Sequence, residues 1–221
     1  MAAMPLNIGL LLFPDLTQLD LTGPYEVFHR LPDARVHLVW KDLSPVRSGG
    51  GLHLVPTTTI ADCPALDVIC VPGGFGTAAL MTDEVVLGFL RTQAATARFV
   101  TAVCTGSLVL GKAGLLEGRR ATSHWAYTDL LPRVGAIYEP GRVVVDGNRI
   151  TGGGVTAGID FALQLAAALC GEQVAKAIQL GIEYNPAPPF AGGHPDGADA
   201  ATIEVARKRV AASHDRLAGL L

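Results

Sequence analysis

Charged side chains are scarce in this 221-residue sequence, and neither sign predominates. They make up 17% of the residues, with 17 Lys and Arg against 20 Asp and Glu. A protein that binds the phosphate backbone of nucleic acid needs an excess of basic side chains to displace counterions. We therefore expect no nucleic-acid partner. Because 49% of the residues are hydrophobic, the composition also argues against an intrinsically disordered chain.

The N-terminal sequence lacks the features of a secretory signal or a membrane span. The first seven residues contain no Lys or Arg, and the apolar run Ile8–Phe13 is too short for a signal core or a span. We therefore predict a cytoplasmic protein with no membrane partner.

Cysteines number only four, at positions 63, 70, 104 and 170, and none forms a C-x-x-C pair. No Cys and His cluster has the spacing of a zinc site, so we expect no metal. In a reducing compartment the four thiols stay free. The question is then whether one of them is reactive.

Internal repeats, long linkers and low-complexity tracts are also missing, and the length suits a single domain over residues 1–221. Apolar strand patterns alternate with helical patterns along the chain. The predicted strands cover 8–13, 36–40, 52–55, 66–71, 99–103 and a hairpin at 143–150; the predicted helices cover 21–31, 83–97, 104–116, 157–170, 174–184 and 200–221. This order predicts an α/β fold with a doubly wound, mostly parallel sheet and helices on both faces, a flavodoxin-like sandwich.

Ligands of such sheets bind beyond the carboxyl ends of the strands. Three predicted strand ends therefore matter most, namely residues 15–20, 73–76 and 104–106.

Cys104 follows a predicted strand directly and opens a predicted helix, within the sequence Ala-Val-Cys-Thr-Gly. Small residues on both sides of a nucleophile are typical of the sharp strand-to-helix turn called a nucleophile elbow. A helix N-terminus should lower the pKa of the thiol and favour the thiolate. The alternative is a buried core cysteine, an interpretation that suits Cys63, Cys70 and Cys170 well.

Asp20 lies between the first predicted strand and the first predicted helix. It could cap that helix, although Thr22 and Gly23 could also do so. It could instead exchange a proton with a neighbouring cysteine or with a bound substrate. Position alone leaves both interpretations open.

Two glycine clusters follow predicted strands, at 73–76 and 152–154. Glycine suits tight turns, which is the simpler explanation. The N–H groups of Gly73 and Gly74 could instead stabilise charge on a reacting atom, and Gly153 could allow close approach of a substrate. No G-K-[ST] follows either cluster, so neither is a phosphate loop.

His124 follows Thr122 and Ser123 and is a candidate for lining the site, with Trp125 and Phe75 as apolar walls. The sequence His194-Pro195-Asp196 resembles a catalytic His-acid pair, but its Gly- and Pro-rich surroundings favour a turn. A Cys-His hydrolase triad is therefore not supported.

Three segments together resemble the ThiJ/PfpI superfamily: Val-Pro-Gly-Gly at 71–74, Ala-Val-Cys-Thr-Gly-Ser at 102–107 and Gly-Leu-Leu-Glu-Gly-Arg-Arg-Ala-Thr-Ser-His-Trp at 114–125. Asp20 to Phe28, Thr105 and the segment 183–190 resemble more narrowly the isonitrile hydratases within that superfamily. The likeness extends from about Ile8 to the last predicted helix.

This resemblance implies a cofactor-free homodimeric enzyme that converts an isonitrile, R–NC, to an N-substituted formamide. By position, Cys104 matches the nucleophile of the family, Asp20 the acid beside it, and Thr105 the hydroxyl residue after it. Peptidase-like members of the superfamily usually have His after the cysteine. Thr105 departs from that pattern, which disfavours protease or deglycase activity.

The hypothesis for the reaction is a thioimidate formed on Cys104. Its thiolate attacks the isonitrile carbon, protonated Asp20 supplies a proton, and water activated by the same carboxyl completes the hydration. Thr105 and an N–H near Gly74 would orient the substrate or the water.

Three alternatives compete with this hypothesis. Some transcription regulators carry a similar domain, but they add a helix-turn-helix module of roughly 80–100 residues, and only about fifty residues follow Gly171 here. A stress-response chaperone or thiol sensor would use Cys104 through its oxidation. A glyoxalase- or amidase-like enzyme would direct the same cysteine at a carbonyl.

Overall fold

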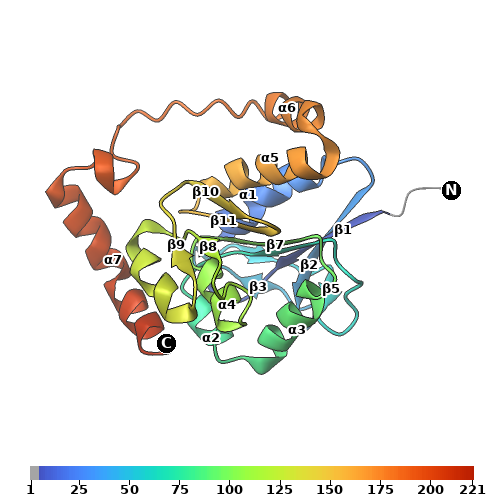
Figure 1. The fold of residues 1–221 in the computed structure, drawn as a ribbon, viewed down its shortest axis with the longest axis horizontal. Coiled ribbons are helices and arrows are strands. Elements are labelled where there is room, and N and C mark those ends of the chain that lie inside the picture. The colour runs from blue at the N-terminus through green and yellow to red at the C-terminus, as the bar shows by residue number, and fades with distance from the viewer. Residues whose placement is uncertain (1–4) are drawn as a thin grey trace.

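The computed structural model describes residues 5–221 and contains a seven-stranded central sheet (Figure 1). The strand order is β10-β11-β7-β6-β1-β2-β5, and every neighbouring pair is parallel except the β10–β11 hairpin. The strands are β1 (Leu6–Leu11), β2 (Ala34–Trp40), β5 (Thr58–Thr59), β6 (Val68–Val71), β7 (Phe99–Val103), β10 (Val143–Asp146) and β11 (Arg149–Gly152). The predicted mostly parallel α/β sheet is confirmed.

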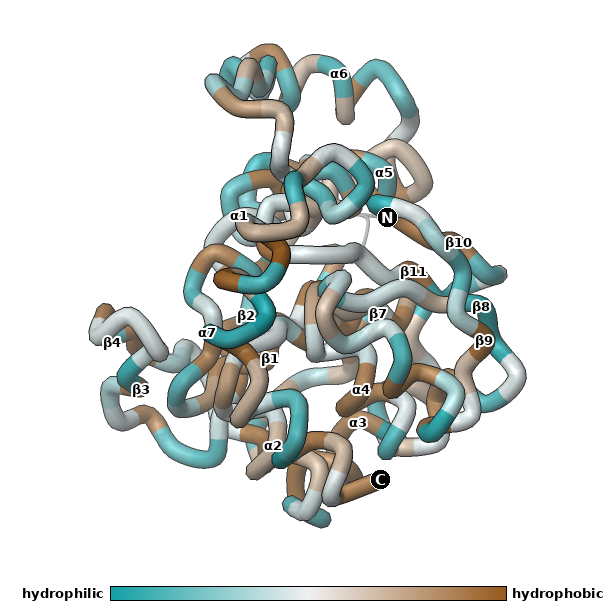
Figure 2. Tube along the Cα trace, turned by 90° about the vertical axis from the view of Figure 1, so that its left-hand side faces the viewer, coloured by the Kyte–Doolittle hydropathy of each residue, from teal (hydrophilic) through white to brown (hydrophobic). Residues whose placement is uncertain are grey.

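Helices cover both faces of the sheet (Figure 1). One face carries α1 (Gln18–Phe28) and α5 (Ala157–Cys170), with α6 (Glu172–Gly181) packed outside α5. Figure 2 shows α6 standing beyond α1 and α5, as the outermost layer. The opposite side carries α2 (Thr77–Leu80), α3 (Glu84–Ala94), α4 (Gly106–Lys112) and the 3₁₀ helix η1 (Trp125–Val134). The last helix, α7 (Ala200–Ala218), contacts η1 and α2.

Short elements complete the chain. They are β3 (Val46–Arg47) paired with β4 (His53–Leu54), β8 (Arg120–Ala121) paired with β9 (Ile137–Tyr138), and the 3₁₀ turn η2 (Pro195–Gly197). The turn η2 contains the His-Pro-Asp sequence, for which the sequence favours a turn.

The core explains why these strands are apolar throughout. All four residues of β6 are buried, as are Val100 to Val103 of β7, because helices cover both sides of them. Phe28 of α1 meets Phe161 of α5 edge to face, with ring centroids 5.9 Å apart. Aromatic contacts of this geometry add to the hydrophobic stabilisation of the helix pair.

Several elements differ from the sequence-based expectation: α2, β3, β5, β8 and β9 were not predicted, and α6 spans Glu172–Gly181 and not 174–184. Helix α1 begins at Gln18, earlier than predicted, so Asp20 lies inside it and Pro24 in its middle. Helix α4 ends at Lys112 and has only seven residues. Residues 125–134 form η1, which the sequence did not predict, because Pro132 and the closely spaced polar residues mask its periodicity.

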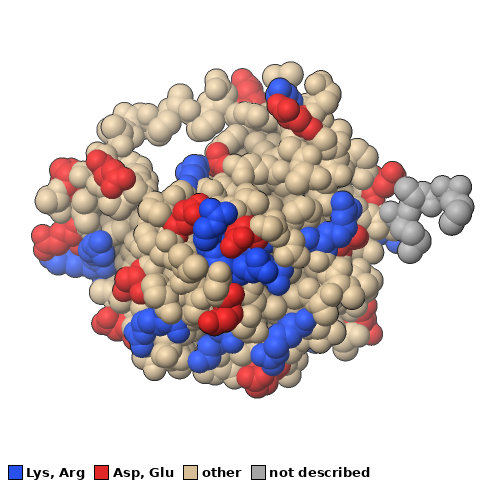
Figure 3. All heavy atoms as spheres, in the orientation of Figure 1, with Lys and Arg blue, Asp and Glu red and all other residues tan. Residues whose placement is uncertain are grey.

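Basic and acidic side chains are interspersed on the face drawn in Figure 3. Within the described residues, no helix combines the length and the apolar character that crossing a bilayer requires.

Gly106, the first residue of α4, has no room for a side chain. A Cβ there would lie 2.1 Å from the carbonyl oxygen of Val71 and 2.7 Å from that of Pro72. Because both are backbone atoms at the end of β6, Gly106→Ala must push α4 away from the sheet. We expect a loss of about 3 kcal/mol or more in the free energy of unfolding, measured by urea denaturation.

Gly88 provides the matched control, since it lies in α3 with nothing within 4 Å of its Cβ position. Gly88→Ala should stabilise the protein by up to about 1 kcal/mol through helix propensity. Equal effects of the two substitutions would contradict the proposed contact between α4 and β6.

Candidate active site

Cys104 lies in the sharp turn between β7 and α4, with a backbone φ of +57°. A non-glycine residue in this conformation costs about 1–3 kcal/mol and needs its surroundings to hold it. The Cys104 N–H donates to the carbonyl oxygens of Gly152 and Gly153, at 3.0 and 2.9 Å. The hydroxyls of Ser107 and Ser123 each donate to its carbonyl oxygen at 3.0 Å. The predicted nucleophile elbow is therefore present.

Asp20 lies in the first turn of α1 and is completely buried. Its Oδ2 accepts a hydrogen bond from the N–H of Gly73 at 2.9 Å. Within residues 5–221, its Oδ1 is buried with no partner at ordinary hydrogen-bond geometry. Thr17, not Asp20, is the N-cap residue of α1. The helix-cap interpretation of Asp20 is therefore wrong. Its side chain instead accepts a hydrogen bond from the loop that follows β6, at the C-terminal ends of the strands.

Asp20 and Cys104 affect each other's protonation. Burial raises the pKa of Asp20 to about 7, although the Gly73 N–H and the Cys104 thiol both lower it. Burial and then the charge of Asp20 raise the pKa of Cys104 well above its usual value. The two groups therefore form a buried pair that holds at least one proton at neutral pH.

The expected low pKa of the Cys104 thiol is wrong for this structure. Cys104 is only 6% exposed, and a carboxyl group lies beside it. Helix α4 is short, so the favourable contribution from its N-terminus is outweighed by burial and by the neighbouring negative charge. The structure therefore does not favour a stable thiolate at Cys104 at neutral pH.

Thr105 is the residue that most directly favours a thiolate at Cys104. Its backbone N–H and its hydroxyl both lower the pKa of the thiol. The hydroxyl oxygen also accepts from the Gly74 N–H at 3.1 Å and lies 3.4 Å from the hydroxyl oxygen of Thr77. The Thr77 hydroxyl donates to the Gly74 carbonyl oxygen at 2.8 Å, and that oxygen is 3.5 Å from the Thr105 hydroxyl, so the Thr105 hydrogen has the sulfur and this distant carbonyl as acceptors.

The glycine loop after β6 brings these groups together. A Cβ on Gly73 would lie 2.7 Å from Thr105 N and 2.8 Å from Cys104 Cβ, so only glycine fits. Gly74 has a φ of +131°, which favours glycine. The Gly73 N–H serves Asp20 and the Gly74 N–H serves Thr105. In this structure the two N–H groups donate to the side chains of Asp20 and Thr105. The substrate-binding interpretation of the sequence has them face a substrate instead.

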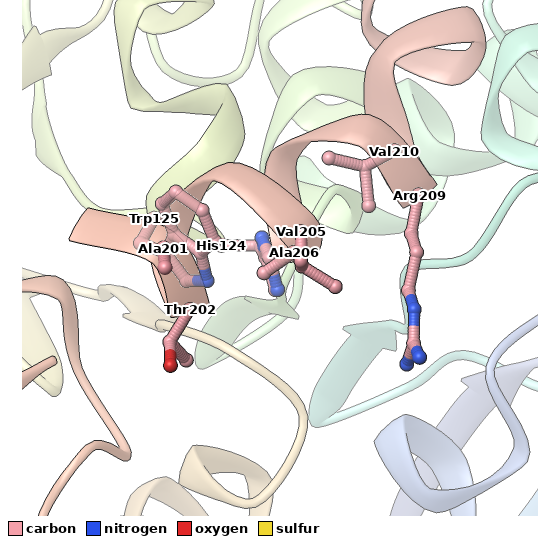
Figure 4. Close-up of a pocket in the computed structure, with 8 residues that line it drawn as sticks. All are labelled: His124, Trp125, Ala201, Thr202, Val205, Ala206, Arg209 and Val210. Carbon is pink, nitrogen blue, oxygen red and sulfur yellow. The ribbon is translucent and has the colours of Figure 1, made fainter. Parts of the chain in front are cut away.

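A pocket of about 550 Å³ lies between the start of η1 and α7 (Figure 4), and Asp20, Cys104 and Thr105 are not among its lining residues. Its lining residues come from the start of η1 and from α7: His124, Trp125, Ala201, Thr202, Val205, Ala206, Arg209 and Val210. The Nδ1 of His124 accepts from the Ala126 N–H, and burial lowers the pKa of the ring, which is therefore neutral at pH 7. The predicted lining residues His124 and Trp125 are thus at a pocket.

The remaining predicted residues fall in two places. Gly153 is buried against the Cys104 backbone. Phe75 is 56% exposed and does not line the pocket between η1 and α7. Within residues 5–221, no group of three or more His, Cys, Asp or Glu side chains is arranged to hold a metal ion.

Sequence reasoning missed several residues of the site. Ser107 and Ser123 hold the Cys104 carbonyl, and Thr77 contacts Thr105. Ser107 and Ser123 lie within the motif segments at 102–107 and 114–125, and this position could have indicated a role in the site. Serine and threonine are too common for that position alone to identify them. The lining residues of α7 gave no signal, because a helical pattern does not tell which surface the helix covers.

Comparison with known proteins places the sequence in a family. The model of the DJ-1/PfpI family matches residues 7–168. Isonitrile hydratase of Pseudomonas putida is 65% identical over 210 residues, which cover 95% of this chain and 92% of that protein. The predicted resemblance to the isonitrile hydratases is therefore confirmed.

One solved structure and one transcription regulator are also similar to this chain. The crystal structure of a ThiJ/PfpI family protein from Pseudomonas syringae superposes with a TM-score of 0.95 at 44% identity, covering 98% of this chain and 90% of that one. The HTH-type transcriptional regulator GbdR of Pseudomonas aeruginosa is 34% identical over 82% of this chain but only 51% of its own length. From its sequence and its fold, the chain belongs to the DJ-1/PfpI family.

Proposed function

We propose that this protein is an isonitrile hydratase that adds water to R–NC to give the formamide R–NH–CHO. The proposal is supported by the extent of its likeness to the Pseudomonas putida enzyme. The observation that carries it is the buried pair of Asp20 and Cys104, with an Asp20 pKa of about 7. Such a pair can supply a nucleophile and a proton to one small substrate.

The first step forms a covalent bond. Asp20 in its carboxylate form takes the thiol proton of Cys104, and the resulting thiolate attacks the isonitrile carbon. The Asp20 carboxylic acid then gives that proton to the same carbon, which yields the thioimidate R–N=CH–S–Cys104. An acid with a pKa near the working pH suits both directions of this transfer.

The second step completes the hydration. Water adds to the thioimidate carbon while the Asp20 carboxylate takes one of its protons, and the Asp20 acid then gives that proton to the nitrogen, which yields R–NH–CH(OH)–S–Cys104. The C–S bond breaks as Asp20 takes the hydroxyl proton, the formamide R–NH–CHO is released, and Asp20 returns that proton to the leaving thiolate. The Thr105 hydroxyl and N–H stabilise the sulfur whenever it carries negative charge.

The thiol-sensor alternative is less well supported. Oxidation-sensing cysteines are exposed and have a low pKa. Cys104 is buried, and its surroundings raise the pKa of its thiol. A carbonyl-directed reaction would use the same nucleophile, so substrate profiling separates it from isonitrile hydration.

The decisive experiment is to measure formamide production from cyclohexyl isocyanide by the purified wild-type protein. Turnover supports the hydratase function. If the isocyanide is not consumed while a dicarbonyl or an amide is converted, the hydratase proposal is wrong and the carbonyl-directed alternative takes its place.

The pH dependence of kcat/KM tests the state of the buried pair. Below pH 7 both Asp20 and Cys104 hold protons, so no base is present to generate the thiolate. We expect kcat/KM to rise tenfold per pH unit below an apparent pKa of about 7 and to level off above it. A profile that is flat from about pH 5 to 8 would contradict the proton transfer.

A further inference from the structure

Helix α7 forms most of the pocket that lies against the start of η1. It provides six of the eight lining residues, and the other two are His124 and Trp125 of the segment that opens η1. The family model ends at residue 168, well before α7 begins at Ala200. This wall of the pocket therefore lies outside the part of the chain that defines the family.

His124, at one end of the pocket, is next to residues that contact the Cys104 backbone. Ser123, the residue before His124, donates its hydroxyl to the Cys104 carbonyl. A Cβ on Gly154 would lie 3.2 Å from the His124 ring, and the preceding residue, Gly153, accepts the Cys104 N–H. The His124 end is thus the part of the pocket that a substituent on a substrate bound at Cys104 would meet first.

The pocket is mainly apolar, and the only full charge among its lining residues in the described chain is positive. Trp125, Val205 and Val210 provide large apolar surfaces. The lining set contains no Asp or Glu, and His124 is neutral because burial lowers its pKa. The guanidinium of Arg209 is then the one full charge among the residues that line the pocket within the described chain.

Arg209, like Arg216 of the same helix, has no side-chain partner among the described residues, whereas Arg207 and Lys208 have one. Lys208 pairs with Glu204, and Arg207 lies over the Trp125 ring with its Cζ 4.9 Å from the centroid. Within residues 5–221, Arg209 makes no ion pair and no side-chain hydrogen bond. Figure 4 shows it at the end of the pocket away from His124 and Trp125. A guanidinium in such a place can bind a carboxylate through two parallel hydrogen bonds.

We propose that the pocket under α7 holds the substituent of the isonitrile and that Arg209 selects substituents ending in a carboxylate. The proposal rests on the hydratase function proposed above and names its substrate class. That class is an isonitrile with an apolar, preferably aromatic, body that lies along Trp125, Val205 and Val210 and carries an acidic group at its far end. The pocket volume is within the range that encloses small organic ligands.

The test compares 4-(isocyanomethyl)benzoate with 4-methylbenzyl isocyanide, which differ mainly in the terminal carboxylate. For the wild type we expect kcat/KM to favour the benzoate by at least about tenfold, the usual scale of a charge-assisted hydrogen bond. Arg209→Gln should reduce that preference to about one, and Arg209→Lys should retain part of it. Raising the salt concentration should reduce the wild-type preference, because Arg209 is exposed to solvent and salt screens exposed charges.

Lys208→Gln is the matched control, since it removes a neighbouring positive charge that does not line the pocket. It should keep the wild-type preference for the benzoate. A wild type that does not prefer the benzoate, or a preference that survives Arg209→Gln or disappears in Lys208→Gln, would overturn the inference. If the same preparations hydrate cyclohexyl isocyanide, only the inference about Arg209 fails and the proposed hydratase function is retained. If they do not hydrate it, the proposed hydratase function is wrong.

Discussion

Replacing Cys104 with serine is expected to lower kcat/KM for an isonitrile by at least about 10⁴-fold, the scale seen when a catalytic nucleophile is removed. Asp20, with a pKa of about 7, cannot deprotonate a serine hydroxyl to a useful extent. An alkoxide would also be a poor leaving group in the second step. Formamide production, measured by chromatography, gives the rate.

The other cysteines provide controls for this substitution. Cys170 ends α5 and Cys63 lies in a loop, and neither belongs to the site. Cys170→Ser and Cys63→Ser should retain at least half of the wild-type activity. If Cys104→Ser keeps more than one per cent of the wild-type kcat/KM, the thioimidate mechanism is wrong and water must attack the isonitrile directly.

Asp20→Asn is expected to lower kcat by about 10³-fold or more while leaving the fold intact. The amide can still accept the Gly73 N–H through its oxygen, so the hydrogen bond that positions residue 20 is preserved. It cannot accept the thiol proton or deliver a proton to the isonitrile carbon. Single-turnover measurement should show that thioimidate formation itself is slowed. Normal formation followed by slow release would restrict Asp20 to the hydrolytic step.

The same substitution should change how stability depends on pH. Burial raises the pKa of Asp20 from 3.8 to about 7, so the folded state holds this proton more tightly than the unfolded state does. The stability that this group contributes is complete below about pH 4 and is lost as the pH rises through about 7.

Asparagine is neutral throughout this range and avoids that loss. Relative to the wild type, the free energy of unfolding of Asp20→Asn should therefore increase by about 2–3 kcal/mol between about pH 5 and about pH 8.5. Urea denaturation at the two pH values measures this difference. A constant difference between the two proteins would mean that Asp20 is already ionised at low pH in the folded state.

Much of the fold could be predicted from the sequence because its signals are local. The apolar runs at β1, β6 and β7 indicate strands buried on both faces, and the Asp-Gly turn at 146–147 indicates the β10–β11 hairpin. The strand at 99–103 and the helix at 157–170 have the predicted bounds. Helix ends were less accurate, as α1 and α4 show, because capping depends on contacts made outside the helix.

The sequence by itself also located the turn that holds Cys104, because small residues around this cysteine are needed for a sharp turn between a strand and a helix. Only the tertiary structure decided what Asp20 and Cys104 do to each other. Their 84-residue separation in the sequence carries no information about distance, whereas burial and Coulomb interaction act through space. For that reason the structure reverses the expected shift of the thiol pKa. It likewise decided that the glycine N–H groups hold Asp20 and Thr105, and that α7 covers the pocket.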